Sequence, residues 1–143
     1  MTTLSIRNLT KKYGQLTALE DFSLEISSGE FMVLLGPSGC GKTTVLRCIA
    51  GLTDITSGEI RIGSELVNKL PPKYRDVAMV FQNYSLYPHM NVYDNIAFPL
   101  KMRKKSRRNI EEKISYVADL LGIKDLLNRK PKEISGGQMQ RVA

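Results

Sequence analysis

A glycine-rich loop of eight residues, Gly36–Thr43, constrains the fold of this chain more than any other feature of its sequence. Its residues, GPSGCGKT, match G-x-x-x-x-G-K-[ST] at every specified position. The apolar run Phe31–Leu35 comes directly before the loop and is typical of a strand buried on both faces. After the loop, Val45, Leu46 and Ile49 recur at helical spacing. A strand, a glycine loop and a helix in this order predict an α/β fold with the loop at the helix N-terminus.

The loop also has the composition needed to hold phosphate groups. Gly36, Gly39 and Gly41 carry no Cβ, so successive backbone N–H groups can point into one concavity. We expect Lys42 to reach the β- and γ-phosphates of ATP, and the Thr43 hydroxyl to bind the Mg²⁺ that bridges them. A loop that served only as a turn would leave this Lys-Thr pair unexplained. The remaining predicted contacts of the loop with ATP are Ser38, Cys40 and Thr44, the last by donation to the α-phosphate.

Length and composition indicate one ordinary domain. The 143 residues are 42% hydrophobic, which is enough for a buried core. The sequence has neither an apolar run long enough to span a membrane nor a signal peptide, so we expect a soluble chain that stays in the cytosol. Cys40 and Cys48 have no histidine near them and fit neither a redox pair nor a zinc site, so free thiols are expected.

The order of predicted elements divides the chain into a nucleotide-binding core, 1–87, and part of a helical subdomain, 88–143. Glycines bound a short predicted strand in the core, and Pro99, Gly122 and Pro131 are predicted to break the helical pattern. The strands expected are Leu4–Leu9, Ala18–Ile26, Phe31–Leu35, Gly58–Gly63 and Val77–Phe81; the helices expected are Val92–Leu100, Asn109–Leu121 and Lys124–Asn128.

A second candidate anion site lies near the end of the sequence. Ser135 is a suitable helix cap, and Gly136 and Gly137 would let a ligand approach the backbone of the following turn. Together with Gln138 they form the sequence SGGQ at the start of a predicted helix.

Four motifs in register resemble the ATPase subunit of ATP-binding cassette (ABC) transporters. They are Tyr13, the Gly36–Thr43 loop, Gln82 after a predicted strand, and Ile134–Gln138. The stretch from Leu70 to Phe98 is similar to the sugar-importer, maltose-type branch. The resemblance implies a RecA-like P-loop NTPase core with an N-terminal antiparallel β segment and part of a helical subdomain, an incomplete ABC ATPase domain. It also implies an ATPase that couples ATP binding and hydrolysis to solute uptake.

The resemblance further implies roles for single residues. Tyr13 would stack on adenine, Lys42 would act on the transferred phosphate, and Gln82 would reach Mg²⁺ or the attacking water. Ser135–Gln138 would close over the γ-phosphate of ATP bound to a second subunit. His89 precedes the region of the family's switch histidine, so we expect it to face solvent or a permease helix instead.

The partners implied are a second ATPase subunit in a head-to-tail dimer and two transmembrane permease subunits. The permeases would dock in a groove lined by Gln82 to Phe98, which implies a peripheral position on the cytoplasmic face of the membrane. In the family, the magnesium-binding aspartate, the catalytic glutamate and the switch histidine follow the SGGQ helix, and this sequence ends at Ala143. We therefore expect this chain alone to hydrolyse ATP very slowly or not at all, and to pair or aggregate through exposed strand edges.

Much of the formal net charge of +7 lies in Lys101–Arg108. Such a run is typical of a solvated loop and helix start, and it also suits contact with anionic lipid headgroups or a protein partner. A soluble ABC protein that acts on nucleic acid is the rival interpretation, and a catalytically silent nucleotide-sensing fragment is a third. The importer-like stretch favours transport, so nucleic acid is not expected as a partner.

Overall fold

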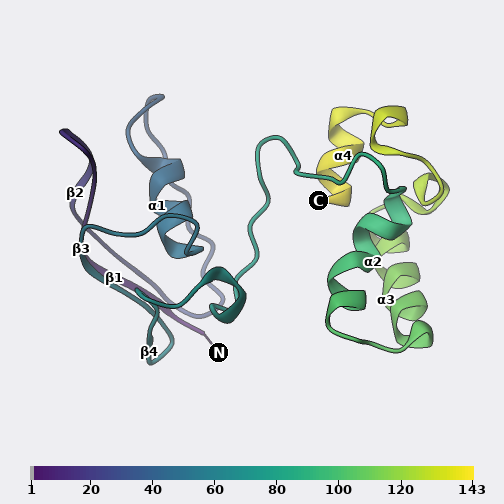
Figure 1. Cartoon of the computed structure of the whole chain (residues 1–143), viewed down its shortest axis with the longest axis horizontal. Helices are drawn as coiled ribbons and strands as arrows, with labels where there is room; N and C mark the ends of the chain where they lie inside the picture. Colours follow the sequence, from purple (N-terminus) through teal and green to yellow (C-terminus); the bar gives the residue numbers. More distant parts are fainter. Residues whose placement is uncertain (1) are drawn as a thin grey trace. The chain divides into compact units, whose positions relative to one another are not determined.

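The computed structural model describes residues 2–143, and the chain forms two compact units. The first unit ends at Met79 and contains the sheet and one α-helix; the second, Val80–Ala143, is helical (Figure 1).

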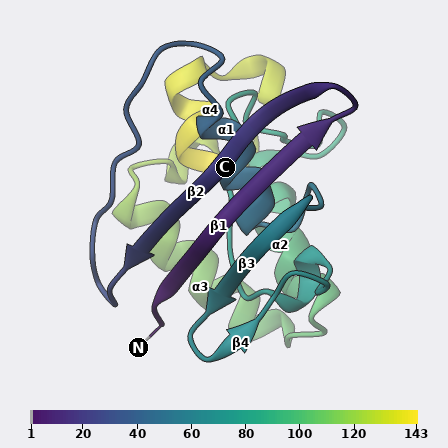
Figure 2. The same cartoon turned by 90° about the vertical axis from the view of Figure 1, so that its left-hand side faces the viewer.

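The first unit is built on a four-stranded antiparallel sheet with strand order β2-β1-β3-β4 (Figure 2). A tight turn at Gly14, with φ of 57°, joins β1 to β2. The elements, in chain order, are β1 (Leu4–Tyr13), β2 (Leu16–Ile26), α1 (Lys42–Ile49), β3 (Ser57–Ile62), β4 (Glu65–Leu66) and the 3₁₀ turn η1 (Pro72–Tyr74).

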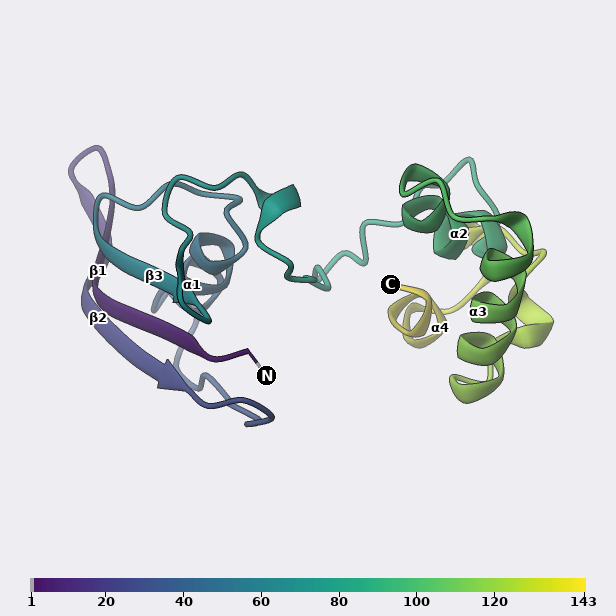
Figure 3. The ribbon, with the colours of Figure 1, turned by 90° about the horizontal axis from the view of Figure 1, so that it is seen from below.

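The core of this unit lies between the sheet and α1, which covers one face of it (Figure 3). Ile6 and Leu9 of β1 are both fully buried, although side chains three residues apart point to opposite faces of a regular strand. A register shift of β1 between these residues, with Asn8 at φ 48°, returns Leu9 to the core face. Val45 and Cys48 of α1 pack against them.

Two apolar runs predicted to be strands do not form strands. Phe31–Leu35 and Val77–Phe81 have no ladder partner within residues 2–143. Phe31 is 90% exposed and Leu35 is 87% exposed. The prediction was wrong because a strand needs a neighbour to satisfy its backbone N–H and C=O groups, and a local apolar run does not supply one.

The second unit packs its helices around two small apolar cores. Helix α2 and helix α3 lie side by side, joined by the turn 103–106 (Figure 1). Asn91 caps α2 and Ser106 caps α3, each accepting a hydrogen bond from a backbone N–H three residues later. The elements are α2 (Val92–Met102), α3 (Arg107–Leu120), the 3₁₀ turns η2 (Lys124–Leu126) and η3 (Pro131–Glu133), and α4 (Gly136–Val142).

The predicted helix breaks were correct in part. Gly122, at φ 60°, follows the end of α3, and Pro131 begins a separate 3₁₀ turn. Pro99, in contrast, lies inside α2, which continues to Met102. Its missing N–H removes one intrahelical hydrogen bond, the one to the carbonyl of Asn95, without ending the helix. The segment expected as a helix after Lys124 is a single 3₁₀ turn. None of the helices within residues 2–143 combines the length and the apolar composition that a membrane span requires.

Candidate functional site

The side chain of Lys42 folds back over the glycine loop that precedes it. Its Nζ donates to the carbonyl oxygens of Gly36 at 2.6 Å and Pro37 at 2.7 Å, and it lies 3.3 Å from Cys40 Sγ. Among the described residues, Lys42 Nζ therefore contacts two carbonyl oxygens and a cysteine sulfur, and it has no carboxylate partner. An anion that entered the loop would meet a cation already in place and would compete only with these carbonyls for it.

The backbone of the loop is shaped by glycines in the left-handed region. Gly39 has φ of 84° and Gly41 has φ of 92°, conformations that strain residues with a Cβ. Gly41 is the N-cap of α1, and its carbonyl accepts from the N–H of Val45 at 2.9 Å. No side chain of the described residues caps α1, and its first turn holds no acidic residue. The free N–H groups and positive end of this helix remain available to a ligand.

Gly41 also lets the loop approach β2 closely. A Cβ at this position would lie 2.6 Å from Leu19 Cδ2 and 2.8 Å from the carbonyl oxygen of Ala18. Both distances are too short for a real contact, so the start of α1 can lie against β2 only because this residue is glycine. The sheet thereby fixes the position of the loop.

The opposite end of α1 is held by a buried arginine that the sequence did not single out. Arg75 is 5% exposed and donates to the carbonyl oxygens of Cys48 at 2.7 Å and Ile49 at 3.1 Å. It also donates to the carbonyls of Asn68 and Leu70. Burial lowers the pKa of Arg75, and burial likewise raises the pKa of the Cys48 thiol. No spacing in the sequence distinguishes this arginine from a surface one.

Tyr13 lies at the end of β1 in the same unit as the loop. Its side chain is 48% exposed, and Lys11 Nζ lies 4.6 Å from the centre of its ring. The aromatic ring is thus presented at the surface, where a planar group can stack on it.

The SGGQ sequence starts α4 as predicted. Ser135 Oγ accepts from the N–H of Gln138 at 3.3 Å, and Gln138 Oε1 accepts from the N–H of Ser135 at 2.8 Å. This reciprocal capping box fixes the first turn of α4. Gly136 and Gly137 add no side chain to this turn, and Gly137 is exposed.

The exposed Gln82 opens a tightly bent segment in the second unit. Tyr84 and Ser85 follow at φ 60° and 50°, and the N–H of Tyr84 donates to the carbonyl of Phe81 at 2.9 Å. A Cβ built on Gly136 would lie 3.4 Å from Tyr84 Oη, so this segment reaches the first turn of α4. No motif in the sequence indicates this contact.

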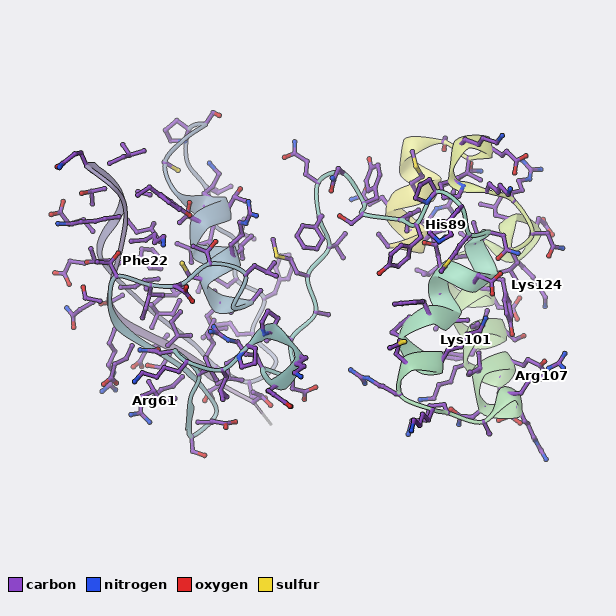
Figure 4. The ribbon with its side chains drawn as sticks, viewed as in Figure 1. Phe22, Arg61, His89, Lys101, Arg107 and Lys124 are labelled. Carbon is purple, nitrogen blue, oxygen red and sulfur yellow. The ribbon has the colours of Figure 1, made fainter. Side chains whose placement is uncertain are left out.

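His89 lies on the surface near the start of α2 (Figure 4). Its ring centre is 5.9 Å from that of Tyr87, in an edge-to-face arrangement. The structure groups Tyr13 and the loop residues in the first unit, and Gln82 and Ser135–Gln138 in the second. Within residues 2–143, no three His, Cys, Asp or Glu side chains gather as a metal site.

The chain matches the ABC transporter family over residues 19–143. It is 57% identical to the trehalose/maltose import ATP-binding protein MalK of Thermococcus litoralis, covering 100% of this chain and 40% of that protein. It is 50% identical to the maltose/maltodextrin import ATP-binding protein MalK of Aliivibrio fischeri, covering 100% of this chain and 39% of the relative. The chain therefore spans about two fifths of the length of the curated relatives it matches.

The fold matches solved ABC cassettes. The dimeric ATP-binding cassette MJ0796, in a post-hydrolysis state bound to ADP and Pi, superposes with a TM-score of 0.87 at 32% identity, covering 97% of this chain and 66% of that one. A second dimeric structure of MJ0796 gives a TM-score of 0.88 at 31% identity, with the same coverage. These matches confirm the predicted α/β P-loop NTPase fold and the predicted family resemblance. The chain belongs to the ABC transporter family.

Proposed function

We propose that the loop Gly36–Thr44 binds the phosphates of ATP. The observation that carries this proposal is the position of Lys42, whose ammonium contacts carbonyls of the loop itself, beside a helix N-terminus that no described side chain caps. A triphosphate would take the place of these carbonyls as the partner of Lys42. The exposed Thr43 hydroxyl would then be a Mg²⁺ ligand, and Thr44 would donate to the α-phosphate.

The shape of the loop fits a polyphosphate. A Cβ on Gly36 would meet Cys40 Sγ within the loop at 2.7 Å, and one on Gly41 would meet β2, so both glycines are needed for the conformation of the loop. Mg²⁺ would contribute charge neutralisation at the phosphates, and the Thr43 hydroxyl is its candidate ligand in the first unit. Ser38 and Gly39 complete the loop around the phosphates, and Tyr13 would stack on the adenine base.

We propose that Ser135, Gly136, Gly137 and Gln138 bind the γ-phosphate of ATP held by a second copy of the subunit. The capping box fixes this turn, and its two glycines add no side chain to it. The dimeric state of the matched cassette, with ADP and Pi bound, supports pairing of two copies, and we propose that the two copies pair head to tail. In such a pair, ATP binding would favour closure of the two subunits.

For the whole protein, we propose the ATPase subunit of an importer for sugars, in which hydrolysis drives transport. The relatives named for trehalose/maltose and maltose/maltodextrin import support this assignment, and neither name points to nucleic acid. Two transmembrane permease subunits would recruit it to the cytoplasmic face of the membrane. Residues 1–87 would belong to the nucleotide-binding core and 88–143 to the helical subdomain.

The test is calorimetry of ATP and ADP binding with Mg²⁺, on the unchanged chain and on Lys42→Ala, with phosphate release measured in parallel. Lys69→Ala is the matched control, because Lys69 is an exposed lysine of the same unit without a side-chain hydrogen bond or ion pair among residues 2–143. We expect Lys42→Ala alone to lose binding, with no turnover by any of the three. Equal binding by Lys42→Ala and Lys69→Ala would refute the phosphate site.

A further inference from the structure

The positive charge of this chain is concentrated in one turn of the second unit. The whole sequence has 21 Lys and Arg against 14 Asp and Glu, a difference of +7. Lys101–Arg108 contributes six of these positive charges and no carboxylate, so the other residues together carry only +1. This segment covers the end of α2, the connecting turn and the start of α3. A charge this localised creates a local field rather than a general property of the surface.

A pocket of about 400 Å³ lies within this positive region. Its lining combines two kinds of side chain: Tyr93 and the 5%-exposed Ile110 are aromatic and apolar, whereas Lys101, Lys105 and Arg107 are cationic. Figure 4 shows Lys101 on α2 and Arg107 on the first turn of α3. We refer to these five residues as the basic pocket.

Two of the three cations are held in place by neighbouring carboxylates. Lys101 Nζ lies 2.7 Å from Asp94 Oδ1, and Arg107 Nε lies 2.8 Å from Glu111 Oε1. Each pair cancels the charge of its cation, and Arg108 is paired in the same way with Glu112. Three of the six cations of Lys101–Arg108 therefore remain without a carboxylate partner among the described residues.

Lys105 has no ion-pair or hydrogen-bond partner for its side chain among residues 2–143, and its backbone N–H donates to the carbonyl of Leu100. Arg103 and Lys104, next to the pocket in sequence, likewise form no ion pair in the described part of the chain. The first turn of α3 contains no acidic residue, so the positive end of this 14-residue helix adds to the same field. The basic pocket therefore combines a concave surface, an uncommitted lysine and a net positive charge.

We propose that the basic pocket binds a phosphate group, with Lys105 as its principal cationic contact and Tyr93 as the surface for the rest of the ligand. Lysine and arginine on a concave surface are suited to phosphate oxygens, and a tyrosine can donate its hydroxyl or contact an apolar moiety. The phosphate could come from a soluble phosphate ester or from the headgroup of an anionic phospholipid. This site is separate from the glycine loop and does not depend on nucleotide binding there.

The test uses the full chain carrying Lys42→Ala, so that phosphate binding at the glycine loop is removed. Inorganic phosphate is titrated while the backbone amide resonances are followed, and shifts at residues 101–110 are read separately from those at 36–44. Lys105→Gln is the test variant. Lys132→Gln removes the same charge from an exposed position of the same unit and is the matched control.

A second arm measures co-sedimentation with phosphatidylcholine vesicles, with and without phosphatidylglycerol. We expect saturable binding in at least one arm, weakened about tenfold or more by Lys105→Gln and unchanged by Lys132→Gln. Binding of inorganic phosphate would identify a soluble source, and binding only to vesicles with phosphatidylglycerol would identify the lipid headgroup. Absence of saturable binding in both arms, or an equal loss in the two variants, would overturn the proposal. Because the nucleotide experiment monitors a different loop, either proposal can fail while the other stands.

Discussion

Replacing Gly41 by alanine tests whether the contact between the glycine loop and β2 positions the start of α1. Gly39 provides the control, because both glycines have φ near 90° and both variants incur backbone strain of about 1–3 kcal/mol. Their surroundings differ. A Cβ on Gly39 would meet no heavy atom of the described residues within 4 Å, whereas one on Gly41 would overlap Leu19 and the carbonyl of Ala18.

The overlap at Gly41 cannot be relieved by rotating one flexible side chain, since the carbonyl of Ala18 belongs to the backbone of β2. Forcing an extra methyl into a packed site costs about 1–3 kcal/mol, so Gly41→Ala should lose that much more unfolding free energy than Gly39→Ala. Leu19 is a buried core residue, so the damage should spread to the sheet.

Urea unfolding followed by far-ultraviolet circular dichroism would measure both variants against the unchanged chain. The difference between the two midpoints, multiplied by the common slope, isolates the overlap from the backbone strain. Equal losses within about 0.5 kcal/mol, or a larger loss for Gly39→Ala, would show that the loop does not lie against β2 as described.

Three further outcomes are expected. Burial raises the pKa of Cys48, so above about pH 8.5 its thiol stays protonated in the folded state and ionises in the unfolded state, and the unfolding free energy should fall as pH rises. Urea titrations in a Cys40→Ser background under reducing conditions would measure this slope, and Cys48→Ala should flatten it. An unchanged slope in Cys48→Ala would contradict a raised pKa of Cys48. Ser135→Ala should lower the unfolding free energy of the second unit by about 1 kcal/mol, whereas Ser135→Asp should retain the helix cap. Thermal or urea unfolding would measure both variants, and equal stability of the two would argue against the cap. A maleimide reagent should label exposed Cys40 and spare buried Cys48, and Mg-ATP should protect Cys40 from labelling. Mass spectrometry of the labelled peptides would measure this, and equal labelling with and without ATP would count against nucleotide binding at the loop.

Several features were predictable because their signals are local. The loop Gly36–Thr43 is recognisable from the spacing of its own residues, and the helix after it from the apolar pattern that follows. The same holds for the cap at Ser135, where the hydrogen-bond partner is only three residues away. In such cases the interaction that stabilises the conformation lies within a few positions along the chain, so the sequence determines it directly.

Other features depended on residues distant in the sequence. Arg75 is identifiable as the buried partner of α1 only when its contact with Cys48 is seen, 27 positions away. Tyr84 reaches Gly136 across the second unit, and neither position signals the other.

The strand register follows the same rule. The register shift in β1 depends on pairing with β2 and β3, and the apolar run Phe31–Leu35 lacks a ladder partner among the described residues. The sequence by itself determined the family, the position of the glycine loop before a helix and the cap at Ser135, because these rest on neighbouring residues. Tertiary structure decided which apolar runs form strands, which arginine is buried and where the cations gather around a pocket, because hydrogen-bond pairing and burial depend on surfaces that are brought together only by folding.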